Sequence, residues 1–85
     1  MEGIDALREQ AKAYVKEKAD AIIKYMSDNN RLNTTESTCH APWYGWDAKY
    51  HQMFPKIADE LRSRGCTVTS KVNFEVTDWY ISVNP

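Results

Sequence analysis

The chain has 85 residues, a formal net charge of −1, 42% hydrophobic residues and 27% charged residues. This length supports one small domain, and the near-average composition excludes a chain that is disordered throughout. Acids and bases balance in both parts of the chain, six against six in residues 1–33 and six against five in residues 34–85. The sequence therefore lacks the basic excess of a nucleic-acid-binding surface and the acidic excess of a DNA mimic.

Targeting signals are not apparent in the sequence. The N-terminal stretch MEGIDALREQ carries acids from its second position and has no apolar core like that of a signal peptide. No run approaches the roughly 18 to 20 apolar residues that span a bilayer. Two cysteines, Cys39 and Cys66, are few for a secreted disulfide scaffold. We expect a cytoplasmic protein with both thiols free and no association with membranes.

A long amphipathic helix is predicted between Ile4 and Met26. Its apolar positions recur at steps of three or four residues, and no Gly or Pro interrupts them. They are Ile4, Leu7, Ala11, Val15, Ala19, Ile22 and Met26. Two arrangements remain open for so long a helix. It either lies across a small sheet as the main packing layer, or its far end overhangs and pairs with a second copy of the chain.

The polar residues 27–38 are rich in turn-forming side chains and end this helix. Within the next stretch, residues 33–40, four Thr or Ser residues are compatible with either a short edge strand or an extended loop. The sequence leaves these two alternatives open.

A second amphipathic helix is predicted to precede Gly65. Asp47 is a suitable N-cap, and Gly65 stands where a left-handed residue would end the helix. Pro55 lacks an amide donor, so we expect either one kinked helix or two nearly collinear segments. The apolar residues that keep their phase across the proline are Tyr50, Phe54, Ile57 and Leu61.

After Gly65 the apolar period changes from 3.6 to 2, which predicts strands over residues 66–72 and 78–83. The link between them, roughly Asn73 to Thr77, is too long and too apolar for a tight turn. The order is helix, uncertain strand, helix, strand, strand. This predicts one α+β domain over residues 1–85, a two-layer sandwich with a long N-terminal helix and a second helix packed on a small antiparallel sheet.

Four residues offer the ligand types of a zinc site: Cys39, His40, His51 and Cys66. Their spacing lacks the short separation of a zinc knuckle, and Cys66 is in phase with Val68 on the expected core face of its strand. The three glycines are too far apart for a phosphate-binding loop. We therefore predict no metal site, no cofactor and no catalytic residue, and we expect a protein that is not an enzyme.

The most unusual feature is a run of aromatic residues between positions 43 and 54. Trp and Tyr in a loop often anchor protein interfaces, but large rings also close the end of a small core. Both interpretations stay open for this run. Trp79 and Tyr80 point to opposite faces of one strand, and we expect Tyr80 on the exposed face. The candidate protein-binding residues are Trp43, Tyr44, Trp46 and Tyr80.

The first helix also carries a basic ridge. Arg8, Lys12 and Lys16 follow one another at steps of four, with acids nearby at Asp5, Glu9 and Asp20. We expect a solvated face of ion pairs, although binding of nucleic acid through this ridge and stacked aromatic rings is an alternative.

Residues 54–83 contain an amphipathic helix that ends in LRSRG, the strand CTVTS and the aromatic final strand DWYISV. In this arrangement the segment resembles small orphan accessory proteins of tailed bacteriophages. The resemblance implies a non-enzymatic factor that binds another protein and modulates or inhibits a host protein in the host cytoplasm. The alternatives are a structural or virion component that self-assembles through the N-terminal helix, and a nucleic-acid-binding module.

Overall fold

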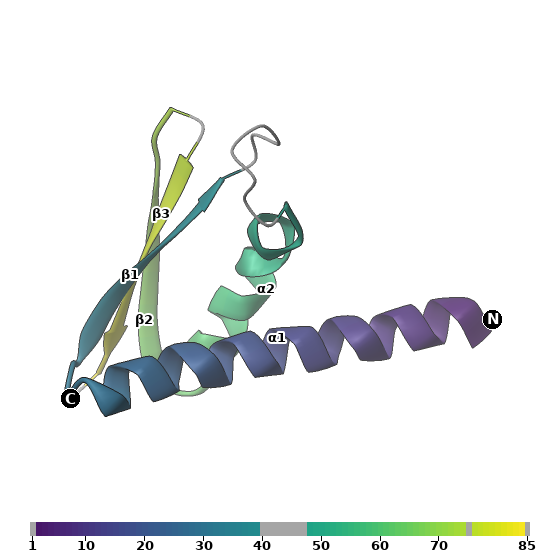
Figure 1. Ribbon diagram of the computed structural model, residues 1–85, viewed down its shortest axis with the longest axis horizontal. Coiled ribbons are helices and arrows are strands. Elements are labelled where there is room, and N and C mark those ends of the chain that lie inside the picture. Colours follow the sequence, from purple (N-terminus) through teal and green to yellow (C-terminus); the bar gives the residue numbers. More distant parts are fainter. Residues whose placement is uncertain (1, 40–47, 75, 85) are drawn as a thin grey trace.

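The computed structural model describes residues 2–39, 48–74 and 76–84 of the chain. It has the predicted α+β architecture, with two helices on one side of a three-stranded antiparallel sheet (Figure 1). The elements are α1 (Glu2–Asp28), β1 (Asn33–Cys39), α2 (Ala48–Ser63), β2 (Cys66–Val72) and β3 (Val76–Val83). The stretch after the first helix is therefore a strand rather than a loop.

The sheet has the order β1-β3-β2, so that β3, the last strand in the chain, is the central one. Both neighbours run antiparallel to it, and Ile81 of β3 is paired with Thr34 of β1 and Val68 of β2. Side chains alternate between the two faces of a sheet. Thr34, Ile81 and Val68, together with every second residue along their strands, therefore lie on the face toward the helices. β1, which lacks apolar residues before Cys39, is stabilised mainly by this pairing.

The hydrophobic core lies between α2 and the inner face of the sheet. Phe54 is fully buried, with its ring edge-on to Tyr50 at 5.2 Å and tilted against Trp79 at 4.7 Å. α1 packs mainly against α2 and contributes its C-terminal half to this core. The buried core residues are Ala19, Ile22, Met26, Phe54, Ile57, Ala58, Leu61, Cys66, Val68 and Ile81.

Both helices end at residues in the left-handed region. α1 ends in a Schellman motif, in which Arg31 N–H donates to the Met26 carbonyl at 2.8 Å and Asn30, with φ of 53°, is the left-handed residue. Gly65 ends α2 with φ of 98°, as its position predicts. Pro55 lies inside one helix, Ala48–Ser63, so the alternative of two separate segments is wrong.

The link between β2 and β3 is shorter than the sequence indicated. β2 continues to Val72 and β3 begins at Val76, and the Asn73 N–H donates to the Val76 carbonyl at 2.7 Å. The expected connection from Asn73 to Thr77 is wrong because Val72 and Thr77 pair across the ladder. The Phe74 side chain is 90% exposed, so this apolar residue is not part of the core.

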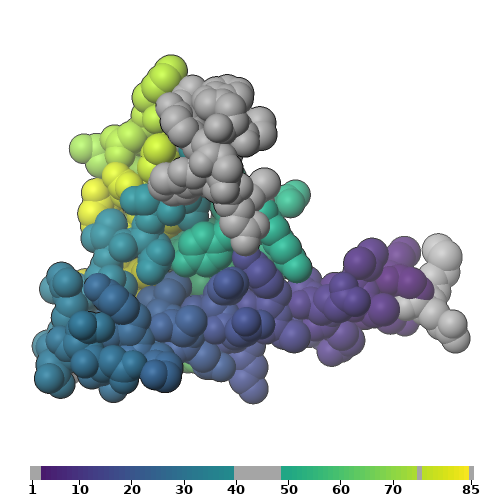
Figure 2. All heavy atoms as spheres, viewed as in Figure 1, coloured from purple at the N-terminus to yellow at the C-terminus, as the bar shows by residue number. Residues whose placement is uncertain are grey.

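The N-terminal half of α1 extends beyond the rest of the protein (Figure 1). At about 1.5 Å per residue, the 27 residues of this helix span roughly 40 Å, which accounts for the longest molecular dimension of 43 Å. Residues 3–10 are all exposed, and the space-filling view shows this end standing clear of the other elements (Figure 2). The N-terminal end of the first helix therefore overhangs, as one of the two alternatives expected, and the pairing of this end with a second copy stays a prediction.

Candidate functional site

The aromatic residues that the sequence singles out fall in two places. Trp43, Tyr44 and Trp46 lie outside the residues that the structure describes. Tyr80 lies on the outer face of the sheet, 42% exposed, and its neighbours across the two ladders are Thr35 and Thr69. The expected exposure of Tyr80 is observed, and its part in binding a protein stays a prediction.

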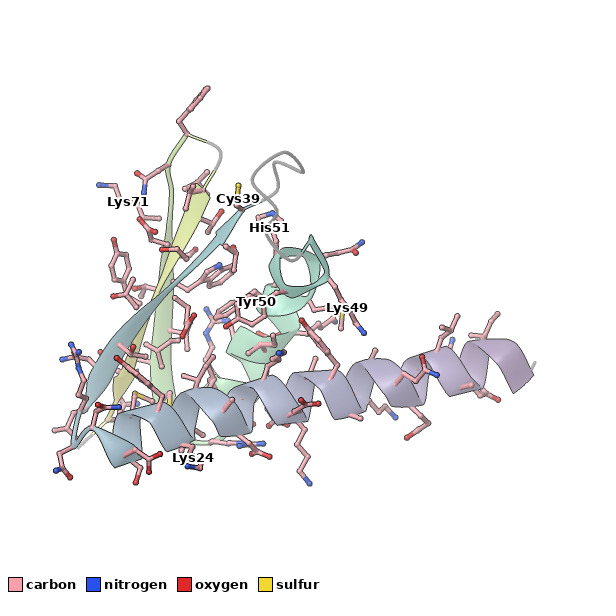
Figure 3. All side chains as sticks on the ribbon, in the orientation of Figure 1. Lys24, Cys39, Lys49, Tyr50, His51 and Lys71 are labelled. Atoms are coloured by element: carbon pink, nitrogen blue, oxygen red, sulfur yellow. The ribbon has the colours of Figure 1, made fainter. Side chains whose placement is uncertain are left out.

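The outer face of the sheet is polar around Tyr80. The Asp78 carboxylate accepts hydrogen bonds from Ser37 Oγ at 2.7 Å and from Asn73 Nδ2 at 2.6 Å. Lys71 is paired with Asp78 in the ladder and points away from the helices (Figure 3). Among the residues that the structure describes, this face presents one half-exposed aromatic ring, Tyr80, surrounded by short hydroxyl side chains, which is a small anchor rather than an apolar patch.

The extending part of α1 provides a larger apolar surface. Ile4 and Leu7 are 46% and 64% exposed, and they lie in phase with Ala19, Ile22 and Met26, which are buried in the core. In a typical surface helix, the apolar stripe is covered along its length by the rest of the domain. Here the apolar stripe continues for about three helical turns beyond the part of α1 that packs against the rest of the domain, so Ile4 and Leu7 are exposed to solvent.

A groove lies beside this stripe, in the angle between α1 and α2. Its volume of about 470 Å³ is within the range of ordinary ligand clefts, and its walls combine an apolar floor with a charged rim. The floor consists of Ala11, Val15 and Met53, and the rim consists of Arg8, Lys12, Lys56 and Glu60. A groove of this shape and chemistry is suited to receive apolar side chains that are flanked by charges.

On the other side of α1, a cluster of aromatic and charged side chains joins α1, β1 and α2. The Tyr50 hydroxyl hydrogen-bonds the Glu36 carboxylate, while Lys18 Nζ lies 5.4 Å from the Tyr14 ring centroid and 5.8 Å from that of Tyr50. Lys49 Nζ lies 4.4 Å from the Tyr14 ring centroid. The Lys18–Tyr50 and Lys49–Tyr14 cation–π contacts join α1 to α2 and stabilise the packing of the two helices, whereas the Lys18–Tyr14 contact lies within α1.

Burial sets the protonation of this cluster. Loss of solvent raises the pKa of the Glu36 carboxyl, and the hydrogen bond from Tyr50 partly opposes this rise. Burial and the nearby Glu36 charge raise the pKa of the Tyr50 hydroxyl well above its usual range. Tyr50 therefore stays protonated and acts as a hydrogen-bond donor to Glu36. The hydrogen bond between Tyr50 and Glu36 satisfies both of these buried groups, which is typical of a structural cluster.

His51, one of the candidate metal ligands, is engaged in a polar contact at the edge of the core. Its Nδ1 lies 2.9 Å from the Thr38 Oγ1, and the Trp79 indole N–H donates to the same hydroxyl at 3.2 Å. Thr38 is 1% exposed, so its hydroxyl satisfies the polar atoms of two half-buried rings. Thr38 of β1 thus connects His51 of α2 and Trp79 of β3.

The structure does not bring the two cysteines together. Cys39 is paired with Val76 and Cys66 with Val83, at opposite ends of β3. Seven residues of strand separate these positions, which is roughly 23 Å. Both thiols are buried and neither forms a disulfide, and burial raises the pKa of the Cys66 thiol. Within residues 2–39, 48–74 and 76–84, no three His, Cys, Asp or Glu side chains converge as metal ligands.

The basic ridge on α1 is largely paired as predicted. Arg8 lies 4.0 Å from Asp5 and Lys12 lies 3.5 Å from Glu9, all with side chains more than 70% exposed. Asp20 departs from the prediction, because it pairs with Arg64 at the end of α2 instead of with the ridge.

Sequence reasoning missed Glu36 and the groove. The alternation of Thr34, Glu36 and Thr38 was a signal that Glu36 shares the inner face, but the strand itself was left open. The groove joins residues of α1 to Met53, Lys56 and Glu60 of α2. No sequence pattern gives the crossing of two helices, so only the three-dimensional structure reveals it.

The fold and these surfaces define a small α+β domain with an extending amphipathic helix. Comparison of the chain with protein-family models, with curated proteins and with solved structures finds no match. Neither α1 nor α2, the helices of the described residues, is long and apolar enough to cross a membrane.

Proposed function

We propose that this protein works by binding another protein, and that the extending half of α1 forms the contact. The observation that supports this proposal is the continuation of the core stripe into solvent at Ile4 and Leu7. Burial of a large aliphatic side chain contributes about 1.5–3 kcal/mol, so leaving two of them exposed forgoes a stabilisation that a partner would restore. Exposed apolar surface of this kind is typical of interaction sites.

The neighbouring groove supports the same interpretation. Association costs at least about 4 kcal/mol in lost freedom of motion, which two side chains alone barely offset. The apolar floor formed by Ala11, Val15 and Met53 continues the surface from Ile4 and Leu7. Stripe and groove together form one continuous contact surface, which suits recognition of a helix.

The protein-binding role of the aromatic residues and the phage accessory role, both expected from the sequence, are part of this proposal. Contacts from Trp43, Tyr44, Trp46 and Tyr80 stay predictions, as does the accessory role in a phage-infected host that the resemblance implies. The nucleic-acid alternative is not favoured by any specific observation, because Arg8 and Lys12 each lie within 4.0 Å of a carboxylate.

Leu7→Glu tests the proposed contact surface. The substitution places a carboxylate in the stripe, and we expect it to abolish stoichiometric binding of a partner that the wild-type chain retains. Ala13→Glu is the matched control, because exposed Ala13 lies roughly 200° around the helix from Ala11. Each tagged variant is incubated with the wild-type chain and with extract of the producing cells, and retained proteins are identified by mass spectrometry.

Circular dichroism shows whether both variants keep the helical content of the wild type. The proposed contact surface is wrong if Leu7→Glu retains the same partners as wild type and Ala13→Glu. A loss shared by both variants would also contradict it, because Ala13 lies away from the stripe.

A further inference from the structure

β1 is an edge strand with an open outer side. In the described sheet β3 lies on one side of β1 and no strand lies on the other (Figure 1). The Val83 N–H donates to the Leu32 carbonyl at 2.8 Å, one step beyond the paired residues of β1 and β3. Residues that exchange hydrogen bonds alternate with residues that do not in an antiparallel ladder. Thr35 and Ser37 therefore direct their main-chain N–H and C=O groups outward, where the described residues offer them no partner.

The opposite edge of the sheet, formed by β2, is protected. The outward carbonyl of Val68 accepts a hydrogen bond from Arg62 Nη2 of α2 at 2.8 Å, and Lys71 adds a charge to the same strand. Charges and caps of this kind prevent another chain from pairing with an edge strand. β1 contains no Lys, Arg or Pro, and its pairing with β3 runs without a bulge over all seven residues. Of the two edges, β1 is therefore the one that can accept a further strand.

A pocket of about 350 Å³ lies beside the open edge. α1 packs mainly against α2, and the pocket occupies the space that remains between α1 and β1. Among the described residues of the sheet, Glu36 of β1 lines it, and the wall that α1 contributes includes Ala21, Ile22 and Tyr25. Neighbouring strands lie about 4.8 Å apart. A strand added to β1 would therefore project the side chain opposite Glu36 into this pocket.

We propose that β1 and the pocket bind an extended segment of another protein, which adds a fourth strand to the three-stranded sheet. Thr35 and Ser37 exchange main-chain hydrogen bonds with the segment. The residue of the segment opposite Glu36 places a large apolar side chain against the wall formed by α1. In this mode of recognition the main-chain hydrogen bonds provide affinity and the side-chain pocket provides specificity. The site is separate from the contact surface proposed on the extending half of α1.

The chemistry of the pocket favours a foreign segment over the β1 strand of a second copy. The inward side chains of β1 are Thr34, Glu36 and Thr38. A second β1 would therefore set hydroxyl or carboxylate groups against the apolar wall of α1, where burial of a polar group is costly. A large apolar side chain gains free energy at the same place. The outer face around Tyr80 is polar, so we expect a segment in which apolar and polar residues alternate.

Selection from a display library of random linear peptides tests the site. We expect enrichment of peptides with alternating apolar and polar residues, and fluorescence anisotropy then gives the dissociation constant of an enriched peptide. Thr35→Pro removes one outward N–H and should weaken binding about tenfold or more. Thr35→Val keeps this N–H and should bind as wild type does. Ser70→Pro makes the matched change on the β2 edge and should also leave binding unchanged.

Two further measurements address the fold and the pocket. Proline is tolerated on an edge strand where its nitrogen faces away from the ladder, so both proline variants should keep the wild-type circular dichroism. Ala21→Trp fills the pocket and should abolish binding, whereas Ala13→Trp, at an exposed position of α1 outside the pocket, should not. In the wild type, the bound peptide should slow hydrogen exchange at the Thr35 and Ser37 amides.

Several outcomes overturn the proposal. It is wrong if no linear peptide is enriched, if Thr35→Pro and Ser70→Pro bind the peptide equally, or if the peptide leaves exchange at Thr35 and Ser37 unchanged. A wild type that dimerises in light scattering, through a contact that Thr35→Pro abolishes, would make a second copy the occupant of the edge. Leu7→Glu should bind the peptide as wild type does, so failure of this site and failure of the contact surface on α1 are distinguishable.

Discussion

Glu36 is a carboxyl group on the inner face of the sheet, beside the core. Its neighbour across the β1–β3 ladder is Trp79, and the Tyr50 hydroxyl donates to it from α2. Burial makes the ionised form costly, which is why the pKa of Glu36 lies above its ordinary value of 4.5. The domain therefore binds a proton at this position more tightly than the unfolded chain does.

Because of this proton linkage, the free energy of unfolding depends on pH. The contribution of Glu36 is fully present below pH 4.5 and is lost as the pH rises through the pKa of the folded state. Glu36→Gln keeps an acceptor for Tyr50 and removes the charge. We expect its free energy of unfolding, relative to wild type, to increase between pH 4 and pH 7, as measured by urea titrations at several pH values.

The control for this experiment is Glu17→Gln, at an exposed position on α1. The difference in free energy of unfolding between Glu17→Gln and wild type should change little over the same pH range. An exposed carboxyl has nearly the same surroundings in the folded and unfolded chains. If both variants follow the same pH profile, burial of Glu36 does not control the linkage.

At the scale of elements, the ends of the helices depend on two left-handed residues. Asn30 adopts φ of 53° at the end of α1, and Gly65 adopts φ of 98° at the end of α2. A Cβ atom built on Gly65 meets no other atom within 4 Å, so space is not the constraint there. The constraint is the backbone conformation, which a residue with a side chain rarely adopts.

Gly65→Ala should lower the free energy of unfolding by about 1–2 kcal/mol, the cost of a left-handed conformation for an L-residue. Gly3→Ala is the matched control in the first turn of α1, where a Cβ also meets no atom within 4 Å. That change should leave stability equal or up to about 1 kcal/mol higher, because Ala is the better helix former. Thermal or urea unfolding measures both, and equal effects would contradict the conformational argument.

The sequence predicted some elements better than others for physical reasons. α1 was predictable because seven apolar residues repeat at its period, and the end of α2 was predictable from Gly65. β1 was left open because its Thr and Ser residues provide no apolar alternation, and its place is decided by pairing with a strand some forty residues later. The β2–β3 link was misjudged because Phe74 and Val76 looked like core residues.

At the scale of the whole molecule, two phenylalanines mark the limits of the core. Phe54 is 0% exposed between the helices and the sheet, and Phe74 is 90% exposed beyond the end of β2. Phe54→Ala should lower the free energy of unfolding by about 3–5 kcal/mol, a large share of the stability of so small a domain. Phe74→Ala should change it by less than about 0.5 kcal/mol.

Urea unfolding followed by tryptophan fluorescence compares the two variants directly. A marked loss of stability in Phe74→Ala would show that the core extends beyond the residues that bury Phe54. Because Phe→Ala is made at a buried and at an exposed site, the comparison distinguishes the loss of stability caused by burial from any effect of removing an aromatic ring as such.

The candidate site was only partly predictable at this scale. The periodicity of α1 places Ile4 and Leu7 on the same face as Ile22, but it does not say where the covering domain stops. That limit is set by where α2 crosses α1, which is a property of tertiary packing. The exposure of Tyr80 followed from strand alternation alone, because β3 has helices on only one of its faces.

The central position of β3 also affects how the protein is made. In the described sheet, β1 and β2 hydrogen-bond to β3 and not to each other, and β3 follows both of them in the chain. While the ribosome is still translating, the nascent β1 and β2 therefore have no neighbour in the ladder until residues 76–83 have left the exit tunnel. Because α1 and α2 need only local hydrogen bonds, we expect both helices to form before the sheet, which assembles once β3 is available.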